Sequence, residues 1–205
     1  MLNSSIRRLI LDLYSYGCIL FGEFKLTSGL TSPYYIDLRV IPSHPKLFRR
    51  VIEVYRVNVE KLNPQVIAGI ATAGLPLASV LAYEMNLPLV YVRREERTHG
   101  TRRVVEGRAE RGLNTVIVDD VATTGGSIAR AVKELRNIGL KVEYAVVLVD
   151  REQGAVENLE KLNVKLKPVI KVSELINTLY EAKVIDEATY NRVTEYIRRW
   201  RCSGV

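Results

Sequence analysis

The sequence predicts an α/β fold built on a central parallel sheet flanked by helices. Short apolar runs alternate with helical patterns between residues 66 and 172, and such alternation requires crossover connections between parallel strands. The third apolar run ends in two adjacent acids, followed by a turn of hydroxyl residues and glycines that leads into a helix. Open parallel sheets bind ligands at the carboxyl ends of their strands. This turn is therefore the first candidate for a functional site.

The first part of the chain is predicted to form a helix and a turn-rich segment. Apolar residues at helical spacing indicate the helix: Ile6, Leu9, Ile10 and Leu13. Gly17 can end it. Residues 24–37 combine turn residues with short strand-like pieces, and a second helix is expected after Pro45.

Five short apolar runs are the predicted strands of the sheet. They cover residues 66–70, 87–92, 115–118, 142–149 and 167–172. Helices are predicted at 77–83 and 127–138, and Gly139 ends the second of them. The tail is predicted to be helical, because four of its apolar residues lie on one helical stripe: Tyr190, Val193, Ile197 and Trp200.

Residues 93–112 interrupt this pattern. The segment holds seven arginines against four glutamates and has almost no apolar periodicity. A loop of this length inside a compact domain is usually functional or mobile. Four of its arginines are interpreted as solvated charges: Arg102, Arg103, Arg108 and Arg111. The length of 205 residues favours a single domain.

The charge balance is basic, with 30 lysines and arginines against 23 acids. Such a chain can bind nucleic acid, an acidic membrane surface or small polyanions. The basic residues concentrate in one loop and no separate DNA-reading helix is seen, so small phosphates are favoured over nucleic acid. No apolar run reaches the roughly 18 residues that span a bilayer, and the N-terminus lacks the pattern of a signal peptide. A cytoplasmic protein is expected, with its two cysteines as free thiols and too few histidines for a histidine-built zinc site.

The turn at residues 119–127 has the composition of a phosphate site. Its glycines and hydroxyls offer backbone N–H groups, side-chain donors and a helix N-terminus to a phosphate monoester. Asp119 and Asp120 would repel a phosphate placed on them, but they suit sugar hydroxyls or a magnesium ion held jointly with substrate phosphates. A phosphorylated pentose satisfies both halves of the turn. The alternative is an ordinary strand-to-helix turn with acids near the helix N-terminus.

The same turn resembles the phosphoribosyl-pyrophosphate motif of type I phosphoribosyltransferases. Four further segments narrow the resemblance to the orotate phosphoribosyltransferase family: residues 24–37, 69–76, 93–100 and 149–154. In that order they resemble the family's hood strand and turn, its pyrophosphate loop, its mobile catalytic loop and the strand end that binds orotate. The resemblance implies the family's fold, a central parallel sheet flanked by helices. It also implies a division into a small N-terminal hood at about 1–40, a core at about 41–172 and a C-terminal helical extension at about 173–205.

The resemblance implies transfer of the 5-phosphoribosyl group from phosphoribosyl pyrophosphate to orotate, giving orotidine 5′-monophosphate and pyrophosphate, in pyrimidine biosynthesis. The implied catalytic residues are Arg97, His99, Asp119 and Asp120. The implied phosphoribosyl-pyrophosphate contacts are Arg93, Arg94, Arg97, His99, Asp119, Asp120, Val121, Ala122, Thr123, Thr124, Gly125, Gly126 and Ser127. The implied orotate contacts are Thr123, Arg151, Tyr34 and Tyr35.

A cofactor and an assembly are implied as well. Mg²⁺ is expected to be held mainly through substrate phosphates and ribose hydroxyls, with no firm direct protein ligand. A homodimer is expected, in which the loop with Arg97 and His99 closes over the neighbouring subunit's site. The expected partners are small-molecule substrates, with neither nucleic acid nor a membrane among them.

Four positions depart from the family's pattern. Arg94 and Arg97 stand where lysine is common, and they keep the positive charge on a planar fork that binds phosphate oxygens in pairs. Thr27 and Ala73 stand where lysine is frequent and remove a cation each. These two replacements are expected to affect the affinity for pyrophosphate more than the reaction itself.

Other functions and roles fit parts of the sequence. A phosphoribosyltransferase for a purine or another base would keep the 119–127 turn but would not need Arg151, because a purine has no carboxylate. A non-catalytic, ligand-sensing regulator with the same fold would bind a ligand without turning it over. Arg151 could instead form a salt bridge at the sheet end, and Tyr34 and Tyr35 could be hood core.

Overall fold

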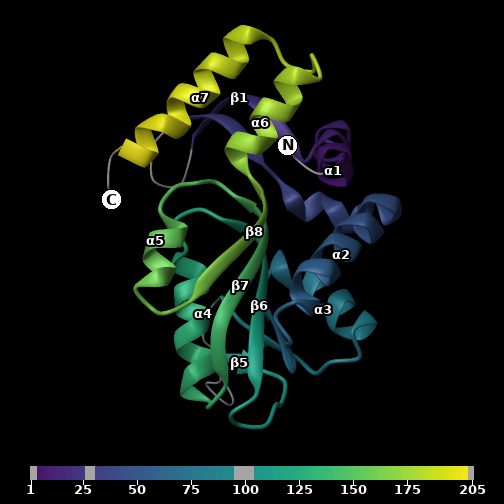
Figure 1. Ribbon diagram of the computed structural model, residues 1–205, viewed down its shortest axis with the longest axis vertical. Helices are drawn as coiled ribbons and strands as arrows, with labels where there is room; N and C mark the ends of the chain where they lie inside the picture. Colours follow the sequence, from purple (N-terminus) through teal and green to yellow (C-terminus); the bar gives the residue numbers. More distant parts are fainter. Residues whose placement is uncertain (1–3, 26–30, 95–103, 203–205) are drawn as a thin grey trace.

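The computed structural model describes residues 4–25, 31–94 and 104–202 (Figure 1). Its strands form a six-stranded sheet and a separate two-stranded hairpin. Helices lie on both sides of the large sheet, and the hairpin lies near one end of it together with the first and last helices.

The large sheet has the strand order β5-β4-β3-β6-β7-β8. Five of its strands run parallel, as predicted: β3 (Val66–Ile70), β4 (Leu89–Val92), β6 (Asn114–Ala122), β7 (Lys141–Asp150) and β8 (Lys165–Lys171). The short β5 (Val105–Glu106) pairs antiparallel with β4. The sheet is therefore mixed at one edge. The reason is that part of the predicted loop returns along β4 and buries Val104 and Val105.

Four helices cover the two faces of this sheet (Figure 1). α2 (Pro45–Glu60) and α3 (Gly74–Glu84) lie on one face, and α4 (Gly126–Asn137) and α5 (Ala155–Glu160) lie on the other. None of the helices in the described ranges is long and apolar enough to cross a membrane.

Each face of the sheet has its own apolar core, and β6 contributes to both. Val116 and Val118 pack in the core with α2 and α3, whereas Ile117 packs in the core with α4. Successive side chains of a strand point to opposite faces. A strand buried on both sides must be apolar at successive positions, which explains the continuous apolar runs that predict this sheet.

The N-terminal segment forms a helix, a hairpin and a short 3-10 helix: α1 (Ser4–Ser15), β1 (Ile19–Lys25), β2 (Thr31–Ile36) and η1 (Leu38–Ser43). The helix agrees with the prediction, and Leu9, Ile10 and Leu13 of its stripe are fully buried. β1 and β2 pair antiparallel. Cys18 is a free thiol, as expected, and burial raises its pKa to about 11.

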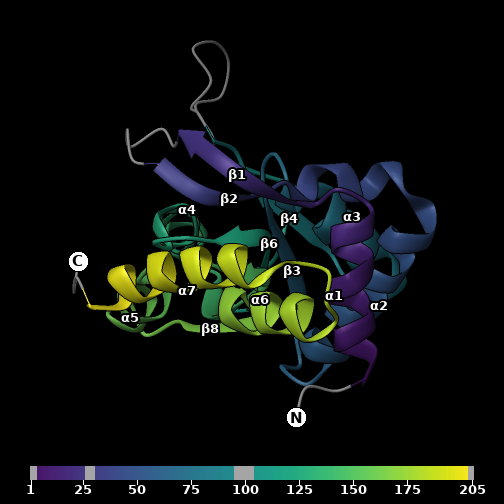
Figure 2. The ribbon, with the colours of Figure 1, turned by 90° about the horizontal axis from the view of Figure 1, so that it is seen from above.

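Two helices follow the last strand: α6 (Val172–Glu181) and α7 (Glu187–Cys202). α7 starts after Asp186, whose carboxylate accepts a hydrogen bond from the backbone N–H of Thr189 at 2.8 Å. Val193 and Ile197 of the predicted stripe are buried. Figure 2 shows α7 between the hairpin and α6, so the last helix of the chain lies against β2.

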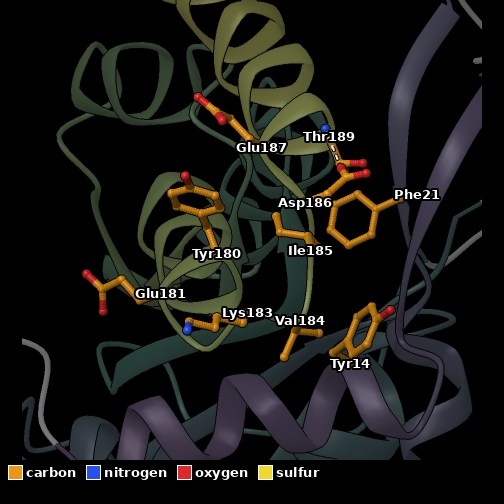
Figure 3. A pocket seen from close by; sticks show the side chains of 10 residues that line it. All are labelled: Tyr14, Phe21, Tyr180, Glu181, Lys183, Val184, Ile185, Asp186, Glu187 and Thr189. Carbon is orange, nitrogen blue, oxygen red and sulfur yellow. Dashed lines mark hydrogen bonds between the residues drawn. The ribbon is translucent and has the colours of Figure 1, made fainter.

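A surface groove of about 890 Å³ lies where α1, β1 and the turn between α6 and α7 meet. Figure 3 shows Tyr14 and Phe21 on one side of this groove and Tyr180 and Ile185 on the other. None of the residues that line it is a predicted site residue. The candidate functional site therefore lies elsewhere, at the strand ends.

Candidate active site

The parallel strands bring the predicted site segments to one edge of the sheet. β3 leads into residues 71–74, β4 into Arg93 and Arg94, β6 into the turn at 123–125 and β7 into Arg151. Because these four strands are neighbours in the sheet and run parallel, their carboxyl ends are adjacent. This is the edge at which open parallel sheets bind ligands.

Asp119 and Asp120 lie near the end of β6 and are almost fully buried, at 6% and 8% exposure. Burial raises the pKa of both carboxyls, and repulsion from Asp120 raises that of Asp119 further. Neither acid forms a salt bridge within the described ranges. Two buried acids without a salt-bridge partner destabilise a fold, and such an arrangement is typical of a binding site.

The backbone around Asp119 is held by two neighbouring elements. The hydroxyl of Tyr55, on α2, donates a hydrogen bond to the carbonyl oxygen of Asp119 at 2.6 Å. Gly74, at the start of α3, lies so close that a Cβ there would be 2.6 Å from the Asp119 carboxylate oxygen Oδ1. The predicted pyrophosphate loop and the acids are therefore packed directly against each other, and only glycine fits between them.

The turn after β6 is open at its tip and fixed at its base. Thr124, Gly126 and Ser127 are exposed. Gly125 has a left-handed backbone with φ of 80° and packs against Ala155 of α5. The N-terminus of α4 follows at once, so free backbone N–H groups and a helix dipole meet here. Such a terminus favours a phosphate group.

Arg151 follows β7 and is only 9% exposed. Its backbone N–H donates to the carbonyl of Ala122 at 2.9 Å, which ties the ends of β6 and β7 together. Its side-chain Nε donates to the hydroxyl of Tyr34 at 3.4 Å, and its guanidinium carbon lies 4.9 Å from the centre of the Tyr34 ring. Its Nη2 has no hydrogen-bond partner among the described residues. The salt bridge that was the alternative role of Arg151 is therefore not formed within the described residues.

The two predicted tyrosines of β2 point to opposite faces of the hairpin. Tyr34 is buried against Arg151, as described. Tyr35 stacks on Phe24 with 5.5 Å between ring centres, and its hydroxyl accepts a hydrogen bond from Arg39 at 2.9 Å. The structure thus brings Tyr34, but not Tyr35, to Arg151, since neighbouring residues of a strand alternate in direction.

Comparisons with known proteins agree with this geometry. The phosphoribosyl transferase domain family matches residues 41–181 of the chain. An orotate phosphoribosyltransferase of Sulfolobus acidocaldarius is 45% identical over 179 residues, which cover 87% of this chain and 90% of that protein. The chain belongs to the orotate phosphoribosyltransferase family.

Solved structures of this family have the same fold. The orotate phosphoribosyltransferase of Aeropyrum pernix is 37% identical, with a TM-score of 0.78 over 87% of this chain and 99% of that one. The UMP synthase of Leishmania donovani is 35% identical, with a TM-score of 0.87, and the match covers 97% of this chain but 43% of that one. These findings confirm the predicted fold and the predicted enzyme class. They do not favour a purine enzyme or a non-catalytic regulator.

The segment after β4 is the one that resembles the family's catalytic loop. Arg93 lies there with Nη1 at 3.6 Å from a carboxylate oxygen of Glu106, and Arg94 is exposed, with its carbonyl accepting a hydrogen bond from Arg130. Arg97 and His99 lie outside the described residues. Their predicted roles rest on the sequence alone.

Two further residues near this edge were not named as site residues, although Gln153 falls within the predicted 149–154 segment. Tyr196 of α7 meets the Tyr34 ring edge-on, with 5.9 Å between ring centres, and its hydroxyl is buried without a partner in the described part of the chain. Gln153 is 4% exposed, and both polar atoms of its amide lack partners there too. Gln153 also lines a groove of about 610 Å³ with Trp200. Tyr196 lies on the apolar stripe of the tail, three residues after Val193 and next to Ile197, so periodicity indicates that it faces inward but not that it meets Tyr34.

Proposed function

We propose that this family member transfers the 5-phosphoribosyl group of phosphoribosyl pyrophosphate to orotate at this sheet edge, forming orotidine 5′-monophosphate for pyrimidine biosynthesis. The main support is one juxtaposition on neighbouring strands. Two buried acids without a salt bridge lie at the end of β6, and a buried arginine without one lies at the end of β7, within the described ranges. The acids suit the hydroxyl donors of a ribose, and the arginine suits the carboxylate of orotate.

Each group would act on a different part of the reacting molecules. The bond from C1 of the ribose to pyrophosphate breaks, the bond to N1 of orotate forms, and the proton on N1 is released to solvent. Positive charge develops on the sugar and negative charge on the leaving group. Asp119 and Asp120 hold the ribose and stabilise its positive charge. Arg94, Arg97 and His99 stabilise pyrophosphate, each by about 3 kcal/mol if they act as preorganised donors do. His99 can also protonate an oxygen of the departing group.

Magnesium belongs to this proposal as the cofactor. Within the described ranges, no three His, Cys, Asp or Glu side chains converge on a metal site. The two strand-end acids nevertheless fit Mg²⁺ in its usual protein setting, where one or two carboxylates act together with substrate phosphates. We expect Asp119 and Asp120 to meet the ion mainly through the ribose hydroxyls. The bound ion supplies positive charge that neutralises pyrophosphate.

A homodimer with shared active sites is also proposed. α3 has no charged residue before Glu84 at its end, and Tyr83 on this helix is 86% exposed. Val57 on the neighbouring α2 is exposed as well, at 47%. Large exposed apolar groups on adjacent helices favour a protein interface. We expect a second copy to cover this face, so that the loop with Arg97 and His99 closes over the partner's site.

The other proposed partners are small molecules only. β4 ends at the proposed phosphate-binding edge, and three arginines of the 93–112 segment follow it directly in the sequence: Arg93, Arg94 and Arg97. Positive charge placed there serves phosphorylated substrates, so we propose no role in binding nucleic acid or membranes. We propose a cytoplasmic location for this activity.

Replacing Arg151 by alanine tests the proposed orotate contact. A lost charge-assisted contact to a carboxylate costs about 1.5–3 kcal/mol, which corresponds to an increase of about ten- to a hundredfold in the KM for orotate. The KM for phosphoribosyl pyrophosphate should change little. Steady-state kinetics with each substrate varied in turn measures both values.

A matched arginine variant provides the control for this experiment. Arg56 forms an exposed pair with Glu60 at 2.8 Å on α2, and Arg56→Ala should leave both KM values unchanged. Equal effects of Arg151→Ala on the two substrates would show that Arg151 acts only structurally. Unchanged orotate kinetics would remove it from the site.

A further inference from the structure

Two hydrogen-bond donors without partners converge on Tyr34 from different elements. The hydroxyl of Tyr196, on α7, and the Nη2 of Arg151, after β7, are buried and have no partner among the described residues. Both side chains touch Tyr34: the Tyr196 ring lies edge-on to it at 5.9 Å between centres, and Arg151 donates to its hydroxyl at 3.4 Å. Three elements distant in sequence therefore meet at Tyr34.

Unpartnered buried polar groups are rare in folded proteins, because each gives up its hydrogen bonds to water without replacement. Arg151 Nη2 can only donate, and the Tyr196 hydroxyl has a hydrogen atom to donate. The group that satisfies both donors at once is one with several acceptor oxygens. A carboxylate has two such oxygens and carries the charge that complements the guanidinium.

We propose that Tyr196 donates its hydroxyl to the carboxylate of bound orotate, beside Arg151, and so contributes to selection of a carboxylated pyrimidine. This inference rests on the proposed function, because it takes orotate as the substrate. The position of the tyrosine is well fixed. Asp186 caps the start of α7 at 2.8 Å from the N–H of Thr189, and Val193 and Ile197 on either side of Tyr196 are buried. The C-terminal helix is then part of the base site as well as a packing element.

The variant Tyr196→Phe removes the hydroxyl and keeps the ring against Tyr34. At saturating phosphoribosyl pyrophosphate, the KM for orotate should rise about tenfold, as expected for a lost hydrogen bond to a charged group. The KM for phosphoribosyl pyrophosphate should stay the same. The Tm of the free enzyme should be unchanged or higher, because an unpartnered buried hydroxyl is replaced by an apolar edge. Calorimetric binding of uracil, which lacks the carboxylate, should not weaken.

Tyr190→Phe on the same helix is the matched control. The Tyr190 hydroxyl donates to Asn177 at 3.0 Å, at an exposed position, so this variant should keep the wild-type KM for orotate. An unchanged orotate KM in Tyr196→Phe would overturn the proposal. A lower Tm of Tyr196→Phe, together with equal increases in the KM for both substrates, would overturn it too. That pattern would show that Tyr196 acts only in packing.

Binding of orotate by calorimetry separates this inference from the proposed function. If the wild type binds orotate but does not turn it over, the proposed function fails, and a weaker affinity in Tyr196→Phe still supports the tyrosine contact. If the wild type does not bind orotate at all in the presence or absence of phosphoribosyl pyrophosphate, both fail.

Discussion

Asparagine at both positions 119 and 120 is expected to abolish turnover and to raise the Tm at neutral pH. The double variant has no carboxylates to hold the ribose hydroxyls or to stabilise the positive charge of the transition state, while its amide side chains have a similar size. Removing two buried charges that have no salt-bridge partner in the described structure relieves their desolvation and mutual repulsion. Stability and activity should therefore change in opposite directions.

The pH dependence of stability follows from the raised pKa of both acids. In the folded state they hold protons at a pH where they are ionised in the unfolded chain, so the folded state binds more protons over that interval. The free energy of unfolding of the wild type should then fall as the pH rises above the ordinary aspartate pKa of about 3.9. The double variant should not show this fall in the free energy of unfolding.

Thermal unfolding between pH 4 and 7, together with steady-state kinetics, checks both expectations. Asp37→Asn is a control of opposite sign. The Arg39 guanidinium, at 2.7 Å, lowers the pKa of the Asp37 carboxyl, so this variant should lose a little stability at neutral pH. More than about a tenth of wild-type kcat/KM in the Asp119→Asn, Asp120→Asn variant would rule out the assigned role of the acids. A Tm of the double variant below that of the wild type would contradict the claim that the two buried carboxylates destabilise the fold.

Two inactive variants are expected to restore activity when they are refolded together. One has Arg97→Ala with His99→Ala, and the other has Asp119→Asn with Asp120→Asn. If the loop of one subunit serves the site of its partner, each mixed dimer contains one site with both lesions and one intact site. Random exchange makes half of the dimers mixed, so activity should return to about a quarter of the wild-type value.

The same experiment contains its own controls. Each variant refolded alone should stay inactive, and a mixture that is never denatured should gain nothing. If each loop serves its own subunit, every site has a lesion and no activity returns. Sedimentation of the wild type as a monomer would contradict the shared-site proposal directly.

The sequence predicts most of the sheet because its strands are buried on both faces. Apolar runs such as residues 66–70 and 145–149 contain no polar residue, so their assignment to buried strands is unambiguous. β5 was not predicted, because its two residues lie within a charged segment and pair through a long-range contact with β4. α5 has six residues and contains less than two full helical turns, which is too short for a periodic pattern.

The site residues that could be predicted are those in local sequence motifs, and the others depend on tertiary packing. Asp119, Asp120 and the glycine turn form a contiguous motif at a strand end, so their proximity was readable from the sequence. Tyr34 and Tyr35 are adjacent in sequence, and only the placement of β2 determines which of them meets Arg151. The position of Tyr196 depends on how α7 packs against the hairpin, and no local pattern contains that information.

The absorbance of orotate, followed with the purified chain, tests the central claim most directly. We expect the absorbance to fall only when orotate, phosphoribosyl pyrophosphate and Mg²⁺ are all present, with pyrophosphate formed in equal amount, and we expect a chelator to stop the change. Adenine or uracil in place of orotate should release no pyrophosphate. Constant orotate absorbance in the complete mixture, or pyrophosphate release with adenine instead, would contradict the assignment of this sheet edge as an orotate phosphoribosyltransferase site.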